Sequence, residues 1–381
     1  MTTTTSTNNT KVRIGLPKEL KSSENRVALT PSAIRDLAAH GVEVFVETSA
    51  GVGSGFPDDL YRAAGATIVS QAADAWSQSM VVKVKEPQPS EFQFLRADLT
   101  LFTYLHLAAY PLVAEALLES RTTALAYETV QLTSGALPLL APMSEIAGRL
   151  APQMAAQHLM KHEGGRGVLF AGAPGVRPAT VSVIGAGLVG LNAASIASGM
   201  GAEVLLFDTN IDRLRTIDAM RIPSVRTVFS SLGSLEDAVA TSDVVIGAVL
   251  VPGARAPRVV SESMVKSMRP GSLVLDVAVD QGGCIETIRE TSHLAPTYVL
   301  HDVLHYAVGN MPGAVPRTST YALSNATLPY VRAVASLGVK AAMEQAPELY
   351  AGLNTAHGEV TNSSVAAALS SAFVSPSSLG F

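Results

Sequence analysis

The sequence has little cysteine, little charge and few aromatic residues. Its 381 residues include one cysteine, Cys284, which excludes an intrachain disulfide framework. Charged residues make up 15% of the chain, against ~25% in a typical soluble domain, and aromatic residues make up 5%. The net charge is −5 and no run of Lys or Arg with interleaved aromatics occurs, which argues against a nucleic-acid partner. An apolar content of 48% excludes a disordered chain.

The low charge raises the question of a membrane protein. Residues 180–202 carry no charge and are long enough to span a bilayer. The segment nevertheless contains five Gly, three Ser and one Asn, which favours a strand, a Gly-rich turn and a buried helix. The polar residues 1–10 lack the basic and then apolar pattern of a secretory signal. We therefore expect a cytoplasmic protein with no membrane partner.

Segments with strand-like patterning alternate with helical segments, which predicts parallel sheets covered by helices on both faces. Thr30 is the expected cap of a helix with Pro31 at its first position. A long Ala-rich helix within 138–161, with Ser144 as its candidate cap, joins two such runs. We predict an α/β fold with two Rossmann-like, doubly wound domains and a cleft between them. Strands are expected at 12–16, 42–48, 80–86, 99–105 and 122–130, then at 181–184, 203–208, 243–250 and 272–280, and the Pro-, Asn- and Gly-rich stretch 306–331 is expected to be a loop.

The clearest motif is G-x-G-x-x-G at Gly185, Gly187 and Gly190. A predicted strand precedes it, a helix follows it, and Asp208 ends the next strand, as in dinucleotide-binding sites. Gly187 would let the backbone approach a pyrophosphate at the helix N-terminus, where the helix dipole favours anions. Asp208 would accept hydrogen bonds from the ribose hydroxyls and repel a 2′-phosphate, which favours NAD over NADP. The alternative is a Gly-rich turn that binds no nucleotide.

Two further charged residues belong to this half of the chain. Arg213 lies one turn inside the helix after Asp208, where it either stacks on adenine or neutralises phosphate, or is a solvated helix charge. Asp280 ends the last predicted strand, in VDQGG. Ligands of open α/β sheets bind outside the carboxyl ends of strands, so Asp280 is expected near the nicotinamide. The alternative for Asp280 is a turn residue before Gly282.

The first half of the chain supplies candidate substrate groups. Arg26, in a loop before the capped helix, offers a bidentate fork for a carboxylate, or is a surface arginine. Lys83 and Lys85 alternate in an apolar segment, and because a buried unpaired ammonium is costly, one of them is expected to face a cleft or pair with Glu86. His106 follows a strand and suits general acid–base chemistry, or is a core histidine. Glu128, also at a strand end, could anchor a catalytic group.

Ordered motifs along nearly the whole chain, from about Lys11 to about Leu369, closely resemble the NAD-dependent alanine dehydrogenases. The resemblance is far more specific than the Gly fingerprint alone, because several motifs occur in order at the expected spacing. The matching segments are RIGLPKE at 13–19, ENRVALTP at 24–31, VVKVKEP at 81–87, LFTYLHLA at 101–108, AYETV at 126–130, VIGAGLVG at 183–190, VIGAVLVPG at 245–253, VDQGGC at 279–284 and NMPGAVPRTSTYALSNATLPY at 310–330.

The resemblance implies roles for individual residues. His106 and Asp280 match the catalytic residues of the family, and Arg26 and Lys85 match its substrate-binding residues, with Asn310 also beside the substrate. It implies NAD as cofactor and no metal. The implied cofactor contacts are Ser144, Gly185, Gly187, Leu188, Val189, Gly190, Asp208, Arg213, Ser230, Val249, Leu250, Val277, Ala278, Val279, Asp280, Val308, Gly309, Asn310 and Met311.

The resemblance also implies an architecture and an activity. The substrate domain would comprise residues 1–139 and 317–381, with the NAD-binding domain, 140–316, inserted into it. The enzyme would interconvert L-alanine with pyruvate and ammonium while reducing NAD, as a homohexamer. Three alternatives compete with this interpretation: the NAD-binding subunit of a transhydrogenase, a saccharopine or opine dehydrogenase, and a non-catalytic NAD-binding protein. Retention of Arg26, Lys85 and His106 together favours an amino-acid site.

Overall fold

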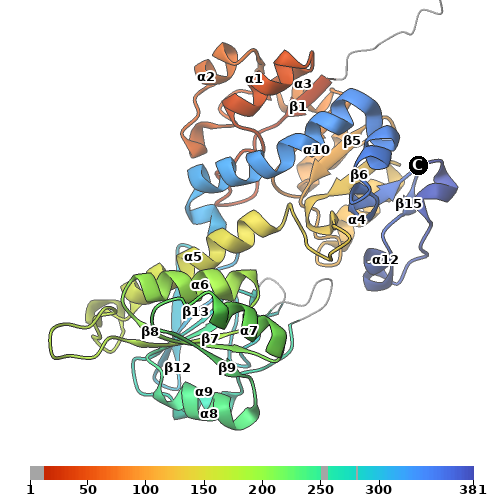
Figure 1. The fold of residues 1–381 in the computed structure, drawn as a ribbon. Helices are drawn as coiled ribbons and strands as arrows, with labels where there is room; N and C mark the ends of the chain where they lie inside the picture. Colours follow the sequence, from red (N-terminus) through yellow and green to blue (C-terminus); the bar gives the residue numbers. More distant parts are fainter. Residues whose placement is uncertain (1–12, 250–255, 280–281) are drawn as a thin grey trace, which may run out of the picture. The chain divides into compact units, whose positions relative to one another are not determined.

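The computed structural model describes residues 13–249, 256–279 and 282–381. The chain divides into two compact units: Met1–Pro142 with Val315–Phe381, and Met143–Ala314. Figure 1 shows a sheet covered by helices in each unit. Within the described residues, no helix is long and apolar enough to cross a membrane. The run 180–202 forms strand β7 (Thr180–Ile184) and helix α6 (Leu188–Gly199), as expected from its Gly and Ser content.

The first unit is built on a sheet with the strand order β15-β14-β6-β5-β4-β1-β2-β3. Strands β1 to β6 pair in parallel, and β14 joins β6 in the antiparallel direction. The strands are β1 (Arg13–Leu16), β2 (Glu43–Glu47), β3 (Thr67–Val69), β4 (Met80–Val82), β5 (Thr100–Thr103), β6 (Thr123–Ala126), β14 (Leu353–Ala356) and β15 (Glu359–Val360). The helices are α1 (Pro31–Ala39), α2 (Asp58–Ala63), α3 (Ala72–Trp76), α4 (Pro111–Glu119), α10 (Pro316–Gln345), α11 (Leu349–Gly352) and α12 (Ser363–Leu369).

The second unit has the strand order β12-β13-β11-β10-β7-β8-β9, parallel except for β12. Its strands are β7, β8 (Glu203–Asp208), β9 (Val225–Phe229), β10 (Val244–Gly247), β11 (Leu273–Asp276), β12 (Thr297–Leu300) and β13 (Val303–Tyr306). Its helices are α6, α7 (Ile211–Ala219), α8 (Leu232–Thr241) and α9 (Glu262–Ser267), and α5 (Ala141–His158) begins at the boundary between the units. Figure 1 shows α6 on one face of this sheet and α8 and α9 on the other. The predicted α/β class with two parallel-rich, doubly wound sheets is confirmed.

Local sequence accounts for several of these elements. Thr30 caps α1 by accepting a hydrogen bond from the backbone N–H of Ala33, with Pro31 at the first helical position. Strands β5, β6, β10 and β11 are almost wholly buried, and their apolar residues pack between the covering helices. In the first unit, this core includes Trp76, Leu101 and Leu117, all fully buried.

Several predicted elements differ from the structure. The strand predicted at 122–130 ends at Ala126, and a 3-10 turn follows at Tyr127–Thr129. The strand predicted at 80–86 ends at Val82, because the lysine-bearing segment that follows turns toward buried carboxylates. The helix predicted to begin near Ser144 begins at Ala141, so Ser144 lies inside it rather than capping it. The strand predicted at 272–280 ends at Asp276, whose carboxylate accepts hydrogen bonds from backbone N–H groups beyond the strand.

The loop predicted at 306–331 was the largest error. Tyr306 ends β13, a short 3-10 helix occupies Met311–Ala314, and α10 begins at Pro316. Pro316 begins the helix where no backbone N–H is needed, so it does not break it. Thr320 and Ser324 of this helix are fully buried and accept hydrogen bonds from the N–H groups of Val27 and Thr30. Figure 1 shows α10 as the long helix of the first unit, where it packs on α1.

Candidate active site

The strand order of the first unit defines where its polar residues gather. After β1 the chain adds β2 and β3 on one side, and then β4, β5 and β6 on the other. The switch point therefore lies between β1 and β4, at whose carboxyl ends ligands of doubly wound sheets bind. Arg26 follows β1, Lys85 follows β4 and His106 follows β5. Two predicted substrate-binding residues and the predicted catalytic histidine thus follow the carboxyl ends of neighbouring strands.

Arg26 is buried and held by Glu24. The Glu24 carboxylate accepts hydrogen bonds from the Arg26 side chain at Nε (2.7 Å) and Nη2 (2.5 Å), and from the Arg26 backbone N–H (3.0 Å). Burial by itself raises the pKa of Glu24, but the Arg26 guanidinium outweighs burial and lowers this pKa to about 2. The pair fixes the plane of the guanidinium, so Arg26 is not the exposed surface arginine of the alternative interpretation.

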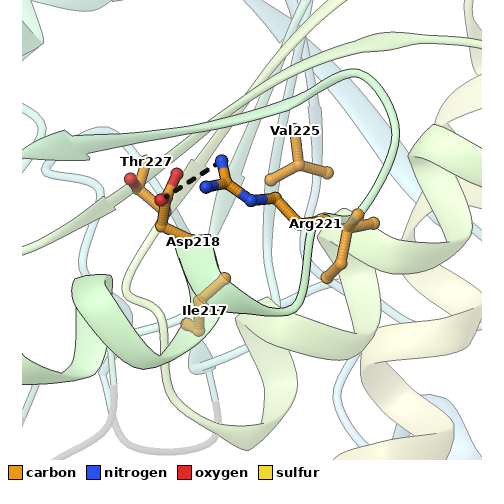
Figure 2. A pocket seen from close by; sticks show the side chains of 6 residues that line it. Ile217, Asp218, Arg221, Val225 and Thr227 are labelled. Carbon is orange, nitrogen blue, oxygen red and sulfur yellow. Dashed lines mark ion pairs between the residues drawn. The ribbon is translucent and has the colours of Figure 1, made fainter.

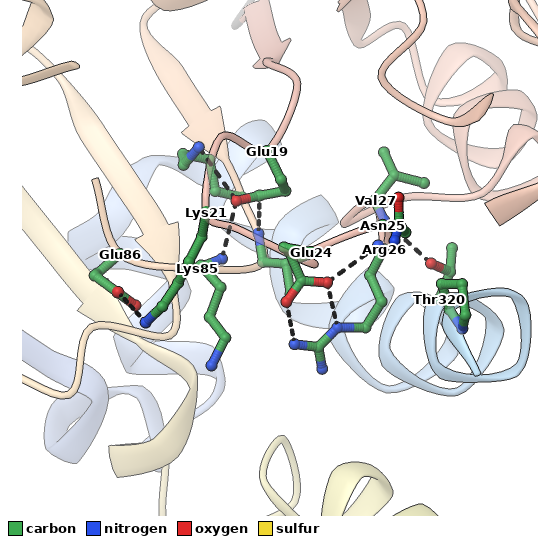
Figure 3. A network of polar contacts seen from close by, with 12 residues as sticks. Glu19, Lys21, Glu24, Asn25, Arg26, Val27, Lys85, Glu86 and Thr320 are labelled. Atoms are coloured by element: carbon green, nitrogen blue, oxygen red, sulfur yellow. Dashed lines mark hydrogen bonds and ion pairs between the residues drawn. The ribbon is translucent and has the colours of Figure 1, made fainter. Parts of the chain in front are cut away.

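Lys85 extends between two ion pairs. Figure 3 shows its side chain between the Lys21–Glu86 pair and the Glu24–Arg26 pair. Its ammonium makes no hydrogen bond or ion pair with any residue that the structure describes. Burial, and then the positive charges of Arg26 and Lys21, lower the pKa of Lys85. A bound anion would relieve this repulsion, which suits Lys85 to a substrate carboxylate.

Lys83 has a different environment and is part of the scaffold. Its fully buried ammonium lies 2.9 Å from Oε1 of Glu91 and 3.3 Å from Oε2 of Glu19. Glu86 pairs instead with Lys21, at 2.6 Å, so the suggested pairing of Glu86 with Lys83 or Lys85 was wrong. Glu19 and Glu91 were not singled out in the sequence, because nothing in their local pattern shows that both reach one buried lysine.

His106 adopts an unusual backbone conformation directly after β5. Its φ is +47°, in the left-handed region, and its ring stacks parallel to Tyr104 with 5.7 Å between centroids. Glu128, which follows β6, accepts a hydrogen bond from the His106 backbone N–H at 2.6 Å. Its Oε1 also lies 3.8 Å from Nδ1 of the His106 ring. The His106 side chain is 37% exposed, so it is not the core histidine of the alternative interpretation.

The Gly-rich loop of the second unit has the geometry that a dinucleotide requires. Gly185 has a φ of +101°, and Gly190 packs so closely on Gly185 that a side chain there would overlap its carbonyl oxygen. Gly187 caps α6, and among the described residues no heavy atom beyond its immediate backbone neighbours lies within 4 Å of the place where its Cβ would stand. The N–H groups at the start of α6, which include Leu188 and Val189, therefore face open space beside Gly187. This arrangement fits a pyrophosphate.

Asp208 ends β8 beside this loop. It accepts hydrogen bonds from the backbone N–H groups of Ala186 and Asn210, each at 2.8 Å, and from Nη1 of Arg213 at 3.2 Å. Burial raises the pKa of Asp208, but these hydrogen bonds and the charge of Arg213 outweigh burial and lower it. Arg213 therefore engages the ribose-binding candidate directly, in addition to the two roles considered for it from the sequence.

The other predicted cofactor contacts follow the carboxyl ends of four strands. Ser230 follows β9, Val249 follows β10, Val277, Ala278 and Val279 follow β11, and Val308, Gly309, Asn310 and Met311 follow β13. Ser144 lies on α5. Leu250 and Asp280 lie outside the described residues. Buried Asp276 accepts hydrogen bonds from the N–H groups of Ala278, Cys284 and Ile285. It therefore fixes both ends of the segment that follows β11. The sequence did not identify Asp276 as a candidate.

Two other features carry no chemistry for this site. A pocket of about 180 Å³ lies between α7 and β9, lined by Ile217, Asp218, Arg221, Ile222, Val225 and Thr227 (Figure 2). It contains none of the predicted site residues, and its Asp218–Arg221 ion pair is on an exposed helix end. Over the described ranges, no group of His, Cys, Asp or Glu side chains gathers in a way that would hold a metal ion.

Comparison with known proteins gives consistent matches over both units. Residues 15–147 match the family model described as alanine dehydrogenase/PNT, N-terminal domain, and residues 151–363 match its C-terminal counterpart. The alanine dehydrogenase of Bacillus subtilis is 53% identical over 354 residues, covering 93% of each chain. That of Mycobacterium tuberculosis is 52% identical over 369 residues, covering 97% of this chain and 100% of the relative.

Solved structures show the same relationship. An L-alanine dehydrogenase structure has a TM-score of 0.92 and 50% identity, covering 94% of this chain and 99% of its own. A transhydrogenase from Sinorhizobium meliloti has a TM-score of 0.79 at 24% identity, covering 92% and 99% of the two chains, a likeness of fold alone.

Proposed function

Since this chain belongs to the alanine dehydrogenase/PNT family, we propose that it is an L-alanine dehydrogenase with NAD as its cofactor. In the oxidative direction, L-alanine, NAD and water give pyruvate, ammonium, NADH and one proton. The observation that carries the proposal is the set of Arg26, Lys85 and His106 at the carboxyl ends of β1, β4 and β5. Two cationic groups and one proton-transfer group suit a small amino acid.

We assign the two half-sites to the two units. Residues 1–139 and 317–381 would form the substrate domain, and residues 140–316 the NAD-binding domain. The open N-terminus of α6, with Gly187 as its cap, supports pyrophosphate binding in the second unit. Asp208 supports ribose binding there and disfavours a 2′-phosphate. Bound NAD supplies the hydride acceptor for the alanine Cα.

Arg26 and Lys85 would bind the substrate carboxylate. The positive charge of Arg26 is already balanced by Glu24, so the guanidinium contributes orientation. Lys85 contributes a positive charge that no described carboxylate neutralises by direct contact. Holding the carboxylate at two points restricts rotation of the amino acid and so aligns its Cα hydrogen for transfer.

His106 would move the protons of the hydrolytic half of the reaction. Once the carbon is oxidised, water adds to it and gives up a proton, and the nitrogen later leaves as ammonia after gaining one. An imidazole that is partly exposed and held at the same sheet edge can serve both transfers. Asp280, outside the described residues, is proposed as the second proton-transfer group from the family resemblance alone.

The test is a direct assay of NADH formation from L-alanine and NAD at alkaline pH. We expect NADH with L-alanine and pyruvate-dependent NADH consumption when ammonium is present. Larger dicarboxylic or two-part amino acids and hydride transfer from NADH to an NADP analogue are the comparison reactions. Turnover in one of those reactions without turnover of L-alanine would contradict the proposal.

We also propose a homohexamer in the cytoplasm, on the basis of the same resemblance. Light scattering on the purified protein tests the assembly, and a mass of six chains is the expected result. A monomer or dimer over the working concentration range would contradict it.

A further inference from the structure

The backbone at His106 is held in a conformation that histidine does not favour by itself. A φ of +47° puts a non-glycine residue in the left-handed region, where its side chain is strained against the backbone. Such a conformation persists only where surrounding contacts impose it. The question is therefore which groups hold His106 there.

Glu128 provides the main restraint. It lies in the 3-10 turn Tyr127–Thr129 that follows β6, next to the end of β5 in the sheet. Its Oε1 accepts hydrogen bonds from two consecutive backbone N–H groups, those of Leu105 at 3.2 Å and His106 at 2.6 Å. One carboxylate thus satisfies both donors at the end of β5 and fixes the turn that presents the His106 side chain.

The ring of His106 is restrained as well as its backbone. Nδ1 lies 3.8 Å from the same Glu128 Oε1, and the ring is within 2° of parallel to the Tyr104 ring. Tyr104 is itself fixed, because its hydroxyl donates a hydrogen bond to the carbonyl of Leu139 at 2.7 Å. Because Nδ1 is the ring nitrogen nearer the carboxylate, Nε2 is the nitrogen left for exchange with a ligand.

The other charged and titratable groups near the pair do not compete for Nδ1. Tyr104 is buried and interacts electrostatically with Arg26, Glu128 and Glu24. Tyr110, whose backbone N–H donates to the His106 carbonyl, accepts a hydrogen bond from Lys21 at its hydroxyl. Glu128 is therefore the carboxylate that the described contacts assign to the His106 ring.

We propose that Glu128 is the positioning residue for His106, holding its strained turn and favouring the neutral tautomer with the proton on Nδ1. This inference rests on the proposed function for the role of Nε2. In that tautomer Nε2 has a free electron pair. It takes one proton from the attacking water as the new C–O bond forms, and returns it to the nitrogen as the C–N bond breaks. No electrons are exchanged with Glu128, which stays a carboxylate throughout.

Two substitutions separate the two tasks of Glu128. In Glu128→Gln the amide oxygen still accepts from the backbone N–H groups, but the charge beside Nδ1 is lost. In Glu128→Ala both are lost. We expect Glu128→Gln to keep a near-normal melting temperature and a KM for L-alanine within about 3-fold, with kcat lowered roughly 10- to 100-fold. Glu128→Ala should lose thermal stability in addition. Glu119→Gln, on the exposed face of α4, is the matched control and should resemble the wild type.

A second measurement does not depend on turnover. Nitrogen-15 spectra of histidine-labelled protein at alkaline pH, with the His106 signals assigned by loss in His106→Asn, report the tautomer. We expect the Nδ1–H form in the wild type and in Glu119→Gln, and a shift toward the Nε2–H form in Glu128→Gln. An Nε2–H tautomer in the wild type, or a kcat of Glu128→Gln equal to that of the control, would overturn the inference. Wild-type protein that shows the Nδ1–H form but does not turn over L-alanine would contradict the proposed function instead.

Discussion

The carboxylate of Glu19, which follows β1, accepts a hydrogen bond of 2.6 Å from the backbone N–H of Val84, which follows β4. These two strands flank the switch point of the first sheet, where the chain diverges to opposite sides. Glu19 also contacts the backbone N–H of Lys85 at 3.4 Å and the ammonium of Lys83 at 3.3 Å. One buried carboxylate therefore links the segment that leads to Arg26 with the segment that carries Lys85.

Removing this link should weaken substrate binding. In Glu19→Ala the Val84 N–H loses its acceptor and Lys83 keeps only Glu91, so the Lys85 segment is free to shift. We expect the KM for L-alanine to rise roughly 10-fold, which corresponds to about 1.4 kcal/mol, while the NAD dissociation constant stays within 2-fold. Steady-state kinetics and NAD titration measure both. Equal losses of alanine and NAD binding would argue against a local effect on Lys85.

Glu19 should also give the first unit a pH-dependent stability. Burial raises the pKa of Glu19 from 4.5 to about 6, so between these pH values the folded protein holds a proton that the unfolded chain releases. Raising the pH through this window should therefore lower the free energy of unfolding, by about 2 kcal/mol in all. Glu24, with its pKa lowered to about 2, acts with the opposite sign in a separate window below its ordinary value.

Trp76, the single tryptophan, makes this measurement specific to one unit. It is fully buried in the first unit, so urea unfolding followed by its fluorescence reports that unit alone. The free energy of unfolding of the wild type minus that of Glu19→Gln should fall by about 2 kcal/mol as the pH rises from 4.5 to about 7, since glutamine does not titrate. A difference that does not vary with pH would count against a raised pKa at Glu19.

Substitutions in the Gly-rich loop should separate folding from cofactor binding. In the part of the chain that the structure describes, no atom beyond the adjoining backbone lies within 4 Å of a Cβ at Gly187. Its φ of −70° is open to alanine, so Gly187→Ala should fold normally. The added methyl would stand where a pyrophosphate must approach, and we expect NAD affinity to fall at least 10-fold. Gly199→Ala, at the exposed end of the same helix, is the control and should bind NAD normally. In contrast, Gly190→Ala should fail to fold stably, because its Cβ would overlap the Gly185 carbonyl oxygen. Normal NAD affinity in Gly187→Ala would exclude this helix end as the pyrophosphate site.

Replacing Asp208 should change the choice of cofactor. Asp208→Ala removes the carboxylate beside the loop and releases Arg213, a cation that suits a 2′-phosphate. We expect the ratio of kcat/KM for NAD over NADP to fall roughly 10-fold or more. The double variant Asp208→Ala with Arg213→Ala tests whether the freed cation contributes. An unchanged ratio in the single variant would contradict a ribose role for Asp208.

Loss of the imidazole should affect catalysis and spare the cofactor. We expect His106→Ala to lower kcat by roughly 100- to 10,000-fold, the range typical of a lost general acid–base. Its NAD affinity should stay within a few fold, because His106 and the Gly-rich loop belong to different compact units. Stopped-flow kinetics and NAD titration suffice to check this, and survival of activity would show that another group moves the protons.

The sequence predicts well where local chemistry decides the structure. The Thr30 cap and the Gly185–Gly190 turn depend on neighbours in the chain and occur as predicted, and the predicted strands occur, although several end earlier than predicted. The parallel order of the strands then brings the predicted residues to the carboxyl ends of the two sheets. Positions that depend on a motif and on the strand order can therefore be predicted from the sequence.

Contacts between segments that are distant in the sequence could not be predicted in this way. The Pro, Asn and Gly content of 306–331 suggested a loop, but Thr320 and Ser324 within it lie fully buried on α10. Their partners, Val27 and Thr30, are almost 300 residues away in sequence. The same holds for Glu19, whose partners Val84 and Lys83 lie on another strand end. No local pattern marks a buried carboxylate whose function is to hold a neighbouring backbone.

The position of α10 in the chain has a consequence for the order in which the protein forms during synthesis. Residues 143–314 are contiguous and contain a whole sheet, so this unit can fold as soon as it leaves the ribosome. The earlier-made Val27 and Thr30 must wait for Thr320 and Ser324, which are made about 290 residues later. The segment between β1 and α1, which carries Arg26, is therefore among the first parts of the chain to be synthesised and among the last to form its native contacts. A nascent chain stopped before residue 316 would contain a folded second unit and an incomplete first unit.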